Sequence, residues 1–324
     1  MIDLNNNIDK YIDNISSDSF SNKKFKLKKD NYRKVTILSK PQINHTKLNK
    51  DDIDKIKEKP IGNHLIKFRK KLYKKFTSNN LNLLNHNIKS LKVKIKYIAP
   101  EILLLRFASG TYSIKKNKIE LIDFFKDGST NHELFHMATS FYNKKLKIAY
   151  SGFQQILFYK NETIGYGLNE GYTDLLVNRY FEVKIKYRCY SYEVCTFFSE
   201  KLEEIVGRKR MENFYLNADL FGLYHYLLNF DTGENVMQFI VSLDYLLKHA
   251  SLFHPEKCEN YFALIECYLA KWCINKNKKE LNNGTIDENT YNKNINNYID
   301  SLCNENLYIE NYVKENDSKK EYSK

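Results

Sequence analysis

Apolar and polar residues change their spacing several times along this chain, and each change predicts a different kind of element. In residues 61–76 the apolar side chains recur at near-helical spacing with Lys and Arg between them, which predicts an amphipathic helix. In residues 91–97 apolar residues alternate with lysines, which is the two-residue repeat of a half-buried strand. Two further strands are predicted at residues 111–114 and 119–125, joined by a polar turn at residues 115–118.

The next predicted element is a helix that contains the sharpest motif of the chain. One of the polar residues 129–131 can cap its start, and it runs from His132 to about residue 141. Residues 148–158 and 162–168 have the pattern of short strands or loops.

From residue 169 to about residue 274 the apolar spacing is helical throughout, which predicts a mainly helical subdomain. The fold class is therefore α+β, with a small, antiparallel-rich sheet ahead of the motif helix and helices after it. Three parts are predicted: a mobile or loosely attached N-terminal arm (1–59), a central domain (60–275) and a polar C-terminal appendage (276–324) with a weak helix around 291–302. The central domain has strands and the motif helix in residues 60–168 and helices in residues 169–275.

Composition narrows the class of protein. The net charge of +13 would suit an acidic partner, but the lysines are spread among Asn, Ile and Tyr and no nucleic-acid-binding motif accompanies them, so no nucleic-acid partner is expected. The six cysteines form no C-x-x-C pair, which is typical of free thiols in a reducing compartment. No signal peptide and no apolar run long enough to span a membrane is found, so a cytoplasmic protein is expected, with leaderless export left open.

His132, Glu133 and His136 form the pattern H-E-x-x-H inside the predicted motif helix. Residues four apart lie on one helix face, so both imidazoles can bind one cation while Glu133 lies beside the open coordination position. Such an arrangement is a metal site with its own base. The alternative is a pair of ordinary surface or core histidines, which the motif alone does not exclude.

A second motif, L-N-E-G-Y-T-D at residues 168–174, opens the next helical stretch. A catalytic zinc takes three protein ligands and keeps a fourth position for water, and Glu170 is the natural third ligand. Asp174, one turn later, faces the same side and can accept a hydrogen bond from the free ring nitrogen of a ligating histidine. Alone, the segment is an ordinary helix start with an acidic first turn; paired with the first motif, it favours a Zn²⁺ site.

At these residues the sequence resembles the gluzincin metallopeptidases. The H-E-x-x-H pattern matches their first motif, and Glu170-x-x-x-Asp174 is similar to the second motif of thermolysin-like and neprilysin-like members. The resemblance is confined to the two motif helices and their flanks. It implies a zincin-like fold and a zinc-dependent hydrolase that cleaves peptide or protein substrates with water activated by Glu133. The segment between His136 and Glu170, residues 137–169, is longer than the corresponding segment of thermolysin-like enzymes, so an inserted hairpin is expected.

The resemblance implies two further features of the active site. An edge strand precedes the first metal helix and pairs with an extended substrate, and residues 119–125 stand where that strand is expected. The oxyanion needs one more donor, and His225 is the first candidate from its distance downstream, although a lone histidine on an apolar helix is more often a packed core residue. The alternative donors are Tyr166, Tyr172, Tyr224 and Tyr226.

Two functions remain open at this point. The first is a zinc-dependent peptidase, most simply an endopeptidase, and the second is a non-catalytic zinc-stabilised domain whose basic arms bind another macromolecule. Glu133 favours the first, because a structural zinc site is normally closed by four ligands and has no use for a carboxylate at that position.

Overall fold

The structure is a computed structural model that describes residues 37–38, 47–96, 110–122, 128–182, 190–250 and 258–303. Its α-helices are α3 (Lys50–Lys57), α4 (Gly62–Leu72), α5 (Ser78–Ser90), α7 (Ser129–Thr139), α8 (Tyr166–Phe181), α9 (Tyr190–Val206), α10 (Arg208–Leu216), α11 (Leu220–Leu227), α12 (Gly233–His249), α13 (Glu259–Asn282) and α14 (Glu288–Cys303). Its strands are β1 (Lys92–Lys96), β2 (Gly110–Ser113), β3 (Lys118–Ile122), β4 (Phe141–Asn143), β5 (Ile148–Ser151), β6 (Gln154–Leu157) and β7 (Glu162–Ile164). The α+β class is confirmed, with all the described strands ahead of α8.

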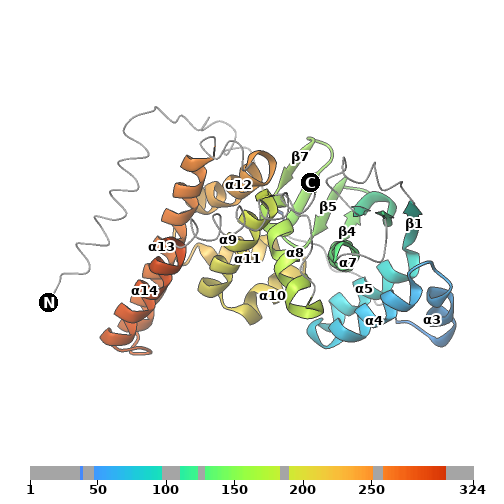
Figure 1. Ribbon diagram of the computed structural model, residues 1–324, viewed down its shortest axis with the longest axis horizontal. Coiled ribbons are helices and arrows are strands. Elements are labelled where there is room, and N and C mark those ends of the chain that lie inside the picture. Colours follow the sequence, from blue (N-terminus) through green and yellow to red (C-terminus); the bar gives the residue numbers. More distant parts are fainter. Residues whose placement is uncertain are drawn as a thin grey trace, which may run out of the picture.

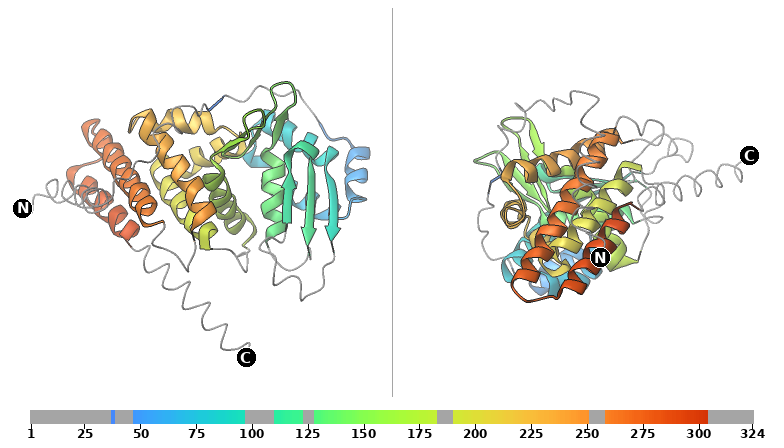
Figure 2. Two further views of the ribbon diagram at one scale, coloured as in Figure 1. Left: turned by 90° about the horizontal axis from the view of Figure 1, so that it is seen from above. Right: turned by 90° about the vertical axis from the view of Figure 1, so that its left-hand side faces the viewer.

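A three-stranded sheet has the order β1-β3-β2, with β1 parallel and β2 antiparallel to the central strand β3. The predicted hairpin is confirmed, and its polar turn includes a short 3-10 helix, Ile114–Lys116. The expectation that residues 119–125 form the edge strand is wrong for the described part, because β1 pairs with the second side of β3. The edge strand beside α7 is β2 (Figure 2).

Helix α7 starts and ends differently from its prediction. Its N-cap is Gly128, and no side chain caps the helix, so the predicted cap among residues 129–131 is wrong. The helix also stops at Thr139, and Phe141 begins strand β4. Helices α4 and α5 pack against α7, in which every residue from Thr130 to Thr139 is buried.

The insertion between the two motifs is larger than a hairpin. It folds into a four-stranded antiparallel sheet of order β4-β5-β6-β7, which contacts α7 through β5 and α8 through β6. Leu38 is attached to this sheet, since the side chain of Gln155 accepts a hydrogen bond from its N–H at 3.1 Å. This second sheet therefore lies against both motif helices.

The helical half surrounds α8, which lies in the middle of the molecule with α7 on one side and α9 and α12 on others (Figure 1). Every residue of α8 from Gly167 to Val177 is buried. A helix buried on all sides must match each of its polar side chains with a partner or a ligand. The polar residues of α8 are therefore where function is expected.

The folded body reaches into both predicted arms. Helix α3 lies within residues 1–59 and buries Ile56 against α4 and α5, while α13 continues to Asn282 and α14 packs along it. Most of the remaining arm residues lie outside the described part of the chain. Within that part, no helix is both long and apolar enough to cross a membrane.

Candidate metal centre

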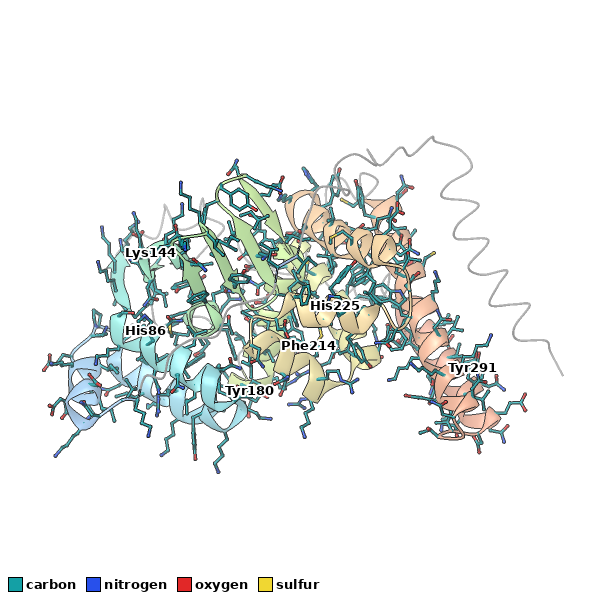
Figure 3. The ribbon with its side chains drawn as sticks, turned by 180° about the vertical axis from the view of Figure 1, so that it is seen from behind. His86, Lys144, Tyr180, Phe214, His225 and Tyr291 are labelled. Atoms are coloured by element: carbon teal, nitrogen blue, oxygen red, sulfur yellow. The ribbon has the colours of Figure 1, made fainter. Side chains whose placement is uncertain are left out.

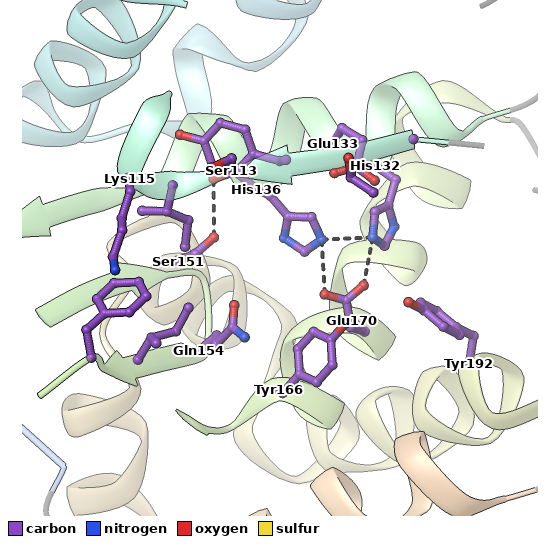
Figure 4. A pocket seen from close by; sticks show the side chains of 16 residues that line it. Ser113, Lys115, His132, Glu133, His136, Ser151, Gln154, Tyr166, Glu170 and Tyr192 are labelled. Atoms are coloured by element: carbon purple, nitrogen blue, oxygen red, sulfur yellow. Dashed lines mark hydrogen bonds and ion pairs between the residues drawn. The ribbon is translucent and has the colours of Figure 1, made fainter. Parts of the chain in front are cut away.

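Two helices bring three potential metal ligands together. His132 and His136 come from α7, Glu170 comes from α8, and all three are buried. The Nε2 atoms of the two imidazoles are 2.8 Å apart, and the Glu170 carboxylate lies 2.9 Å from Nε2 of His132 and 3.2 Å from Nε2 of His136 (Figure 4). The three groups thus point at one another.

This donor set fits zinc. In a tetrahedral site with bonds of about 2.0–2.2 Å, ligand atoms are about 3.4 Å apart. The separations of 2.8, 2.9 and 3.2 Å are a few tenths of an ångström shorter, so a small outward movement admits the ion. Two imidazole nitrogens and one carboxylate are also the ligand set of a known class of catalytic zinc sites.

The outer nitrogens of both imidazoles are held by α8. Nδ1 of His132 lies 2.6 Å from Oδ1 of Asp174, and Nδ1 of His136 lies 3.2 Å from the amide nitrogen Nδ2 of Asn169. With both outer nitrogens in contact with α8, the inner Nε2 atoms face Glu170. An acceptor such as the Asp174 carboxylate fixes the orientation of the ring and raises the affinity of a histidine for a metal.

The turn between β5 and β6 holds Asn169 in place. The backbone N–H of Phe153 donates to Oδ1 of Asn169 at 3.0 Å, and the N–H of Gly152 donates to Oγ1 of Thr139 at 2.9 Å. Gly152 has φ of 51°, and a Cβ there would lie 2.2 Å from the same Oδ1. Only glycine suits this position, so the inserted sheet has a direct part in positioning His136.

Glu170 is ionised although it is buried. Burial raises the pKa of its carboxyl, but the charge of His136 and hydrogen bonds from His132 and His136 outweigh burial and hold that pKa well below its ordinary 4.5. The carboxylate is therefore negatively charged at neutral pH, as a zinc ligand must be.

A pocket of about 490 Å³ opens beside the three ligands. Strand β2 and the turn after it form one side, β6 forms another, and Tyr166 and Tyr192 lie beside Glu170 (Figure 4). Glu133 lines this pocket together with His132 and His136. A ligand in the pocket would therefore meet the metal ligands and Glu133 at once.

Gly110, the first residue of β2, makes room for Glu133. A Cβ at this position would lie 2.9 Å from Cγ of Glu133, closer than real contacts allow. The start of β2 therefore borders the Glu133 side chain directly. This contact places the candidate base between the metal helix and the edge strand.

The start of α8 is anchored by Asp244 of α12. Its carboxylate accepts hydrogen bonds from the N–H groups of Gly165 and Gly167 at 2.9 and 2.7 Å. Burial raises the pKa of Asp244 to about 7, although these backbone bonds and the charge of Lys248 oppose the rise. A third helix thus fixes the segment that carries the Glu170 ligand.

The candidate oxyanion donors are widely separated. His225 is exposed on α11 (Figure 3). Neither His225 nor its neighbours Tyr224 and Tyr226 line the pocket. Tyr172 is buried and donates to a carboxylate of α9. Tyr166 lines the pocket, and burial together with the charge of Glu170 raises the pKa of its hydroxyl, so it stays a neutral donor.

Sequence reasoning missed two residues of this site. Asn169 stands next to Glu170 in the second motif, and this adjacency is the sequence feature that could have marked it as part of the site. Tyr192 lines the pocket from α9, with its ring 6.4 Å from that of His132 between centroids. Nothing in the local pattern of α9 marks Tyr192, because its role depends on how α9 packs against α8.

Comparisons of the chain with protein-family models, with curated proteins and with solved structures found no match. The function is therefore inferred from the residues and geometry of the site.

Proposed function

We propose that this protein is a zinc-dependent peptidase of the gluzincin type, acting as an endopeptidase. The observation that carries the proposal is the convergence of His132, His136 and Glu170 in a pocket that Glu133 also lines. The ligand group comprises three residues within the described chain, whereas a structural zinc site is normally closed by four. Three ligands beside a substrate-sized pocket support catalysis.

The chain's own residues have distinct roles in this proposal. Zinc, when bound, supplies a Lewis acid that polarises the scissile carbonyl and acidifies water. Glu133 takes the proton from the attacking water and delivers it to the leaving amine. Asp174 and Asn169 hold the imidazoles in orientation through their outer nitrogens.

A tyrosine hydroxyl completes the proposed mechanism. Tyr166 and Tyr192 line the pocket beside Glu170, so either can donate to the developing oxyanion. We expect replacement of the donor by Phe to lower kcat by about 10²–10³-fold at unchanged zinc content. If both Phe variants keep full activity, neither hydroxyl is the donor.

The substrate is proposed to bind as an added strand. Strand β2 pairs with β3 along one edge, and its residues line the pocket along the other. No other strand among the described residues pairs with this edge, so an extended peptide can pair with it and pass over the metal ligands, as in the zincin-like arrangement that the motifs imply. Since β2 lies along the side of the pocket, cleavage within a chain suits it better than removal of one terminal residue.

Glu133→Gln tests the proposal. The variant keeps both histidines, so zinc measured by elemental analysis should stay at one ion per chain. Hydrolysis of a peptide library should fall by about 10²–10⁴-fold, because a neutral amide cannot accept the proton. Glu170→Gln should instead lose zinc.

Glu200→Gln is the matched control, because Glu200 is exposed on α9 and does not line the pocket. It should cleave as fast as the parent. Chelator should abolish parental cleavage, and added zinc should restore it. A zinc-loaded parent that cleaves nothing in a broad screen would instead favour a non-catalytic zinc-stabilised domain.

A further inference from the structure

The pocket continues past the metal ligands to an end that carries a positive charge. Lys115 lies in the short helix after β2, and its ammonium is 3.6 Å from the centre of the Phe158 ring. Phe158 in turn packs edge-on against Tyr142, with ring centroids 5.6 Å apart. Figure 4 shows Lys115 on the other side of His136 from His132. A cation–π contact of this kind restricts where the ammonium lies.

Lys115 has no carboxylate partner within the described residues. In the same sheet, Lys96 and Lys118 both pair with Glu120. Lys115 is also the only Lys or Arg among the described residues that line the pocket. The carboxylates of that lining are those of Glu133 and Glu170. A substrate therefore meets one positive charge at this end, and that charge is available to it.

The walls of this end suit a short side chain with an apolar stem. Ile114 and Ile156 line it, and the carboxamide of Gln154 adds a polar group. An aspartate or glutamate side chain has both parts: methylenes that contact the isoleucines and a carboxylate that pairs with the ammonium.

The direction of β2 relates this end to the scissile bond. Gly110 at the start of β2 borders Glu133, and Lys115 follows the end of the strand. A peptide that pairs antiparallel with β2 has its N-terminal residues near Lys115, and antiparallel pairs are the commoner kind. At about 3.3 Å per residue, the side chain near Lys115 precedes the scissile bond by roughly two to four residues.

We propose that Lys115, held on Phe158, selects an Asp or Glu side chain two to four residues before the scissile bond. This inference rests on the proposed peptidase function and adds its substrate class: peptides with an acidic residue on the N-terminal side of the cleaved bond. Phe158 positions the ammonium, and the isoleucines exclude water from part of the ion pair.

The zinc-loaded protein should be tested on a peptide library with Asp, Glu, Gln and Lys varied at each position, and cleavage sites read by mass spectrometry. Asp and Glu should be preferred over Gln by about three- to tenfold in kcat/KM at one position before the cleaved bond. The preference should weaken in 0.5 M salt, because the pair is partly exposed. Lys115→Glu should reverse it in favour of Lys.

Lys116→Glu is the control, because Lys116 is exposed in the same turn and does not line the pocket. It changes the net charge equally and should keep the acidic preference. Cleavage without any charge preference, or with one that survives Lys115→Glu, overturns the subsite and leaves the peptidase proposal standing. Absence of cleavage of every peptide overturns both, starting with the proposed function.

Discussion

The two ends of α8 carry charged side chains, Glu170 buried and Arg179 half-buried, in opposite arrangements. Toward its C-terminus, Arg179 donates to both oxygens of Glu203 at 2.5 and 2.9 Å and to Glu212 at 3.2 Å. Toward its N-terminus, Glu170 faces the two imidazoles of His132 and His136 instead of a guanidinium. The C-terminal end therefore forms ion pairs. At the N-terminal end, a carboxylate and two imidazoles that can each bind a metal point at one another.

This difference separates a structural cluster from a binding site. Around Arg179 each carboxylate already has a permanent cation, and Tyr172 and Tyr180 donate to the same carboxylates, so their charges are already compensated within the protein. Around Glu170 the donors meet where a cation can bind, next to a pocket. Burial of charge therefore says little about function until the partners are known.

The largest expected effect follows from removing the cation of the structural cluster. Arg179→Met leaves Glu203 and Glu212 buried without their shared partner, so the free energy of unfolding should fall by about 3–5 kcal/mol. Urea denaturation of the zinc-saturated protein measures it. Zinc affinity of the folded protein should stay unchanged, because the two clusters share no partner.

Arg208→Met is the control for this variant. Arg208 also contacts Glu212, at 3.1 Å, but its side chain is 55% exposed, so its loss should cost less than about 1 kcal/mol. Equal losses for both variants would show that the buried cluster contributes no more than a surface pair.

A smaller effect is expected at the metal end. Asp174→Ala removes the acceptor at Nδ1 of His132 and should weaken zinc affinity by about 10–100-fold, as measured by competition with a chelator. Asp174→Asn keeps an acceptor oxygen and should recover part of the loss. Zinc affinity unaffected by either change would mean that Asp174 does not orient His132.

The sequence was informative about the ligands because helical spacing fixes which side chains share a face. His132 with His136, and Glu170 with Asp174, could be paired from their four-residue separations alone. The helical second half and the strands at residues 92–96 and 118–122 followed from periodicity in the same way.

The sequence could not give the order of strands or the meeting of distant segments. Alternation marks β3 as a strand, but only its parallel pairing with β1 shows that β2 forms the edge. His225 stands at a suggestive distance along the chain, yet α11 carries it to the surface, and Tyr192 of α9 lines the pocket instead. Such outcomes depend on packing between helices, which local patterns do not encode.

The carboxylates that other helices place at the two ends of α8 also titrate differently. Burial raises the pKa of Glu212, but hydrogen bonds from Tyr180 and Arg208 and nearby positive charges outweigh it, so the pKa is lowered. Burial raises the pKa of Asp244, at the start of α8, to about 7. Glu212 therefore adds stability above its ordinary pKa of 4.5 and loses it in acid, whereas Asp244 has the opposite sign.

The smallest expected effect tests that sign at Asp244. Because its folded-state pKa of about 7 exceeds the ordinary 3.8, its contribution to stability is full below 3.8 and is lost as pH rises through 7. Between pH 6 and pH 8 the parent should lose about 1 kcal/mol of unfolding free energy more than Asp244→Asn does. Urea denaturation of both proteins in chelator measures this difference, and the histidines titrate alike in both, so they cancel. If the difference in unfolding free energy between the two proteins stays constant from pH 6 to pH 8, the pKa of Asp244 is not raised. The backbone N–H groups of Gly165 and Gly167 would then offset the burial of this carboxylate, as Arg179 does for Glu203.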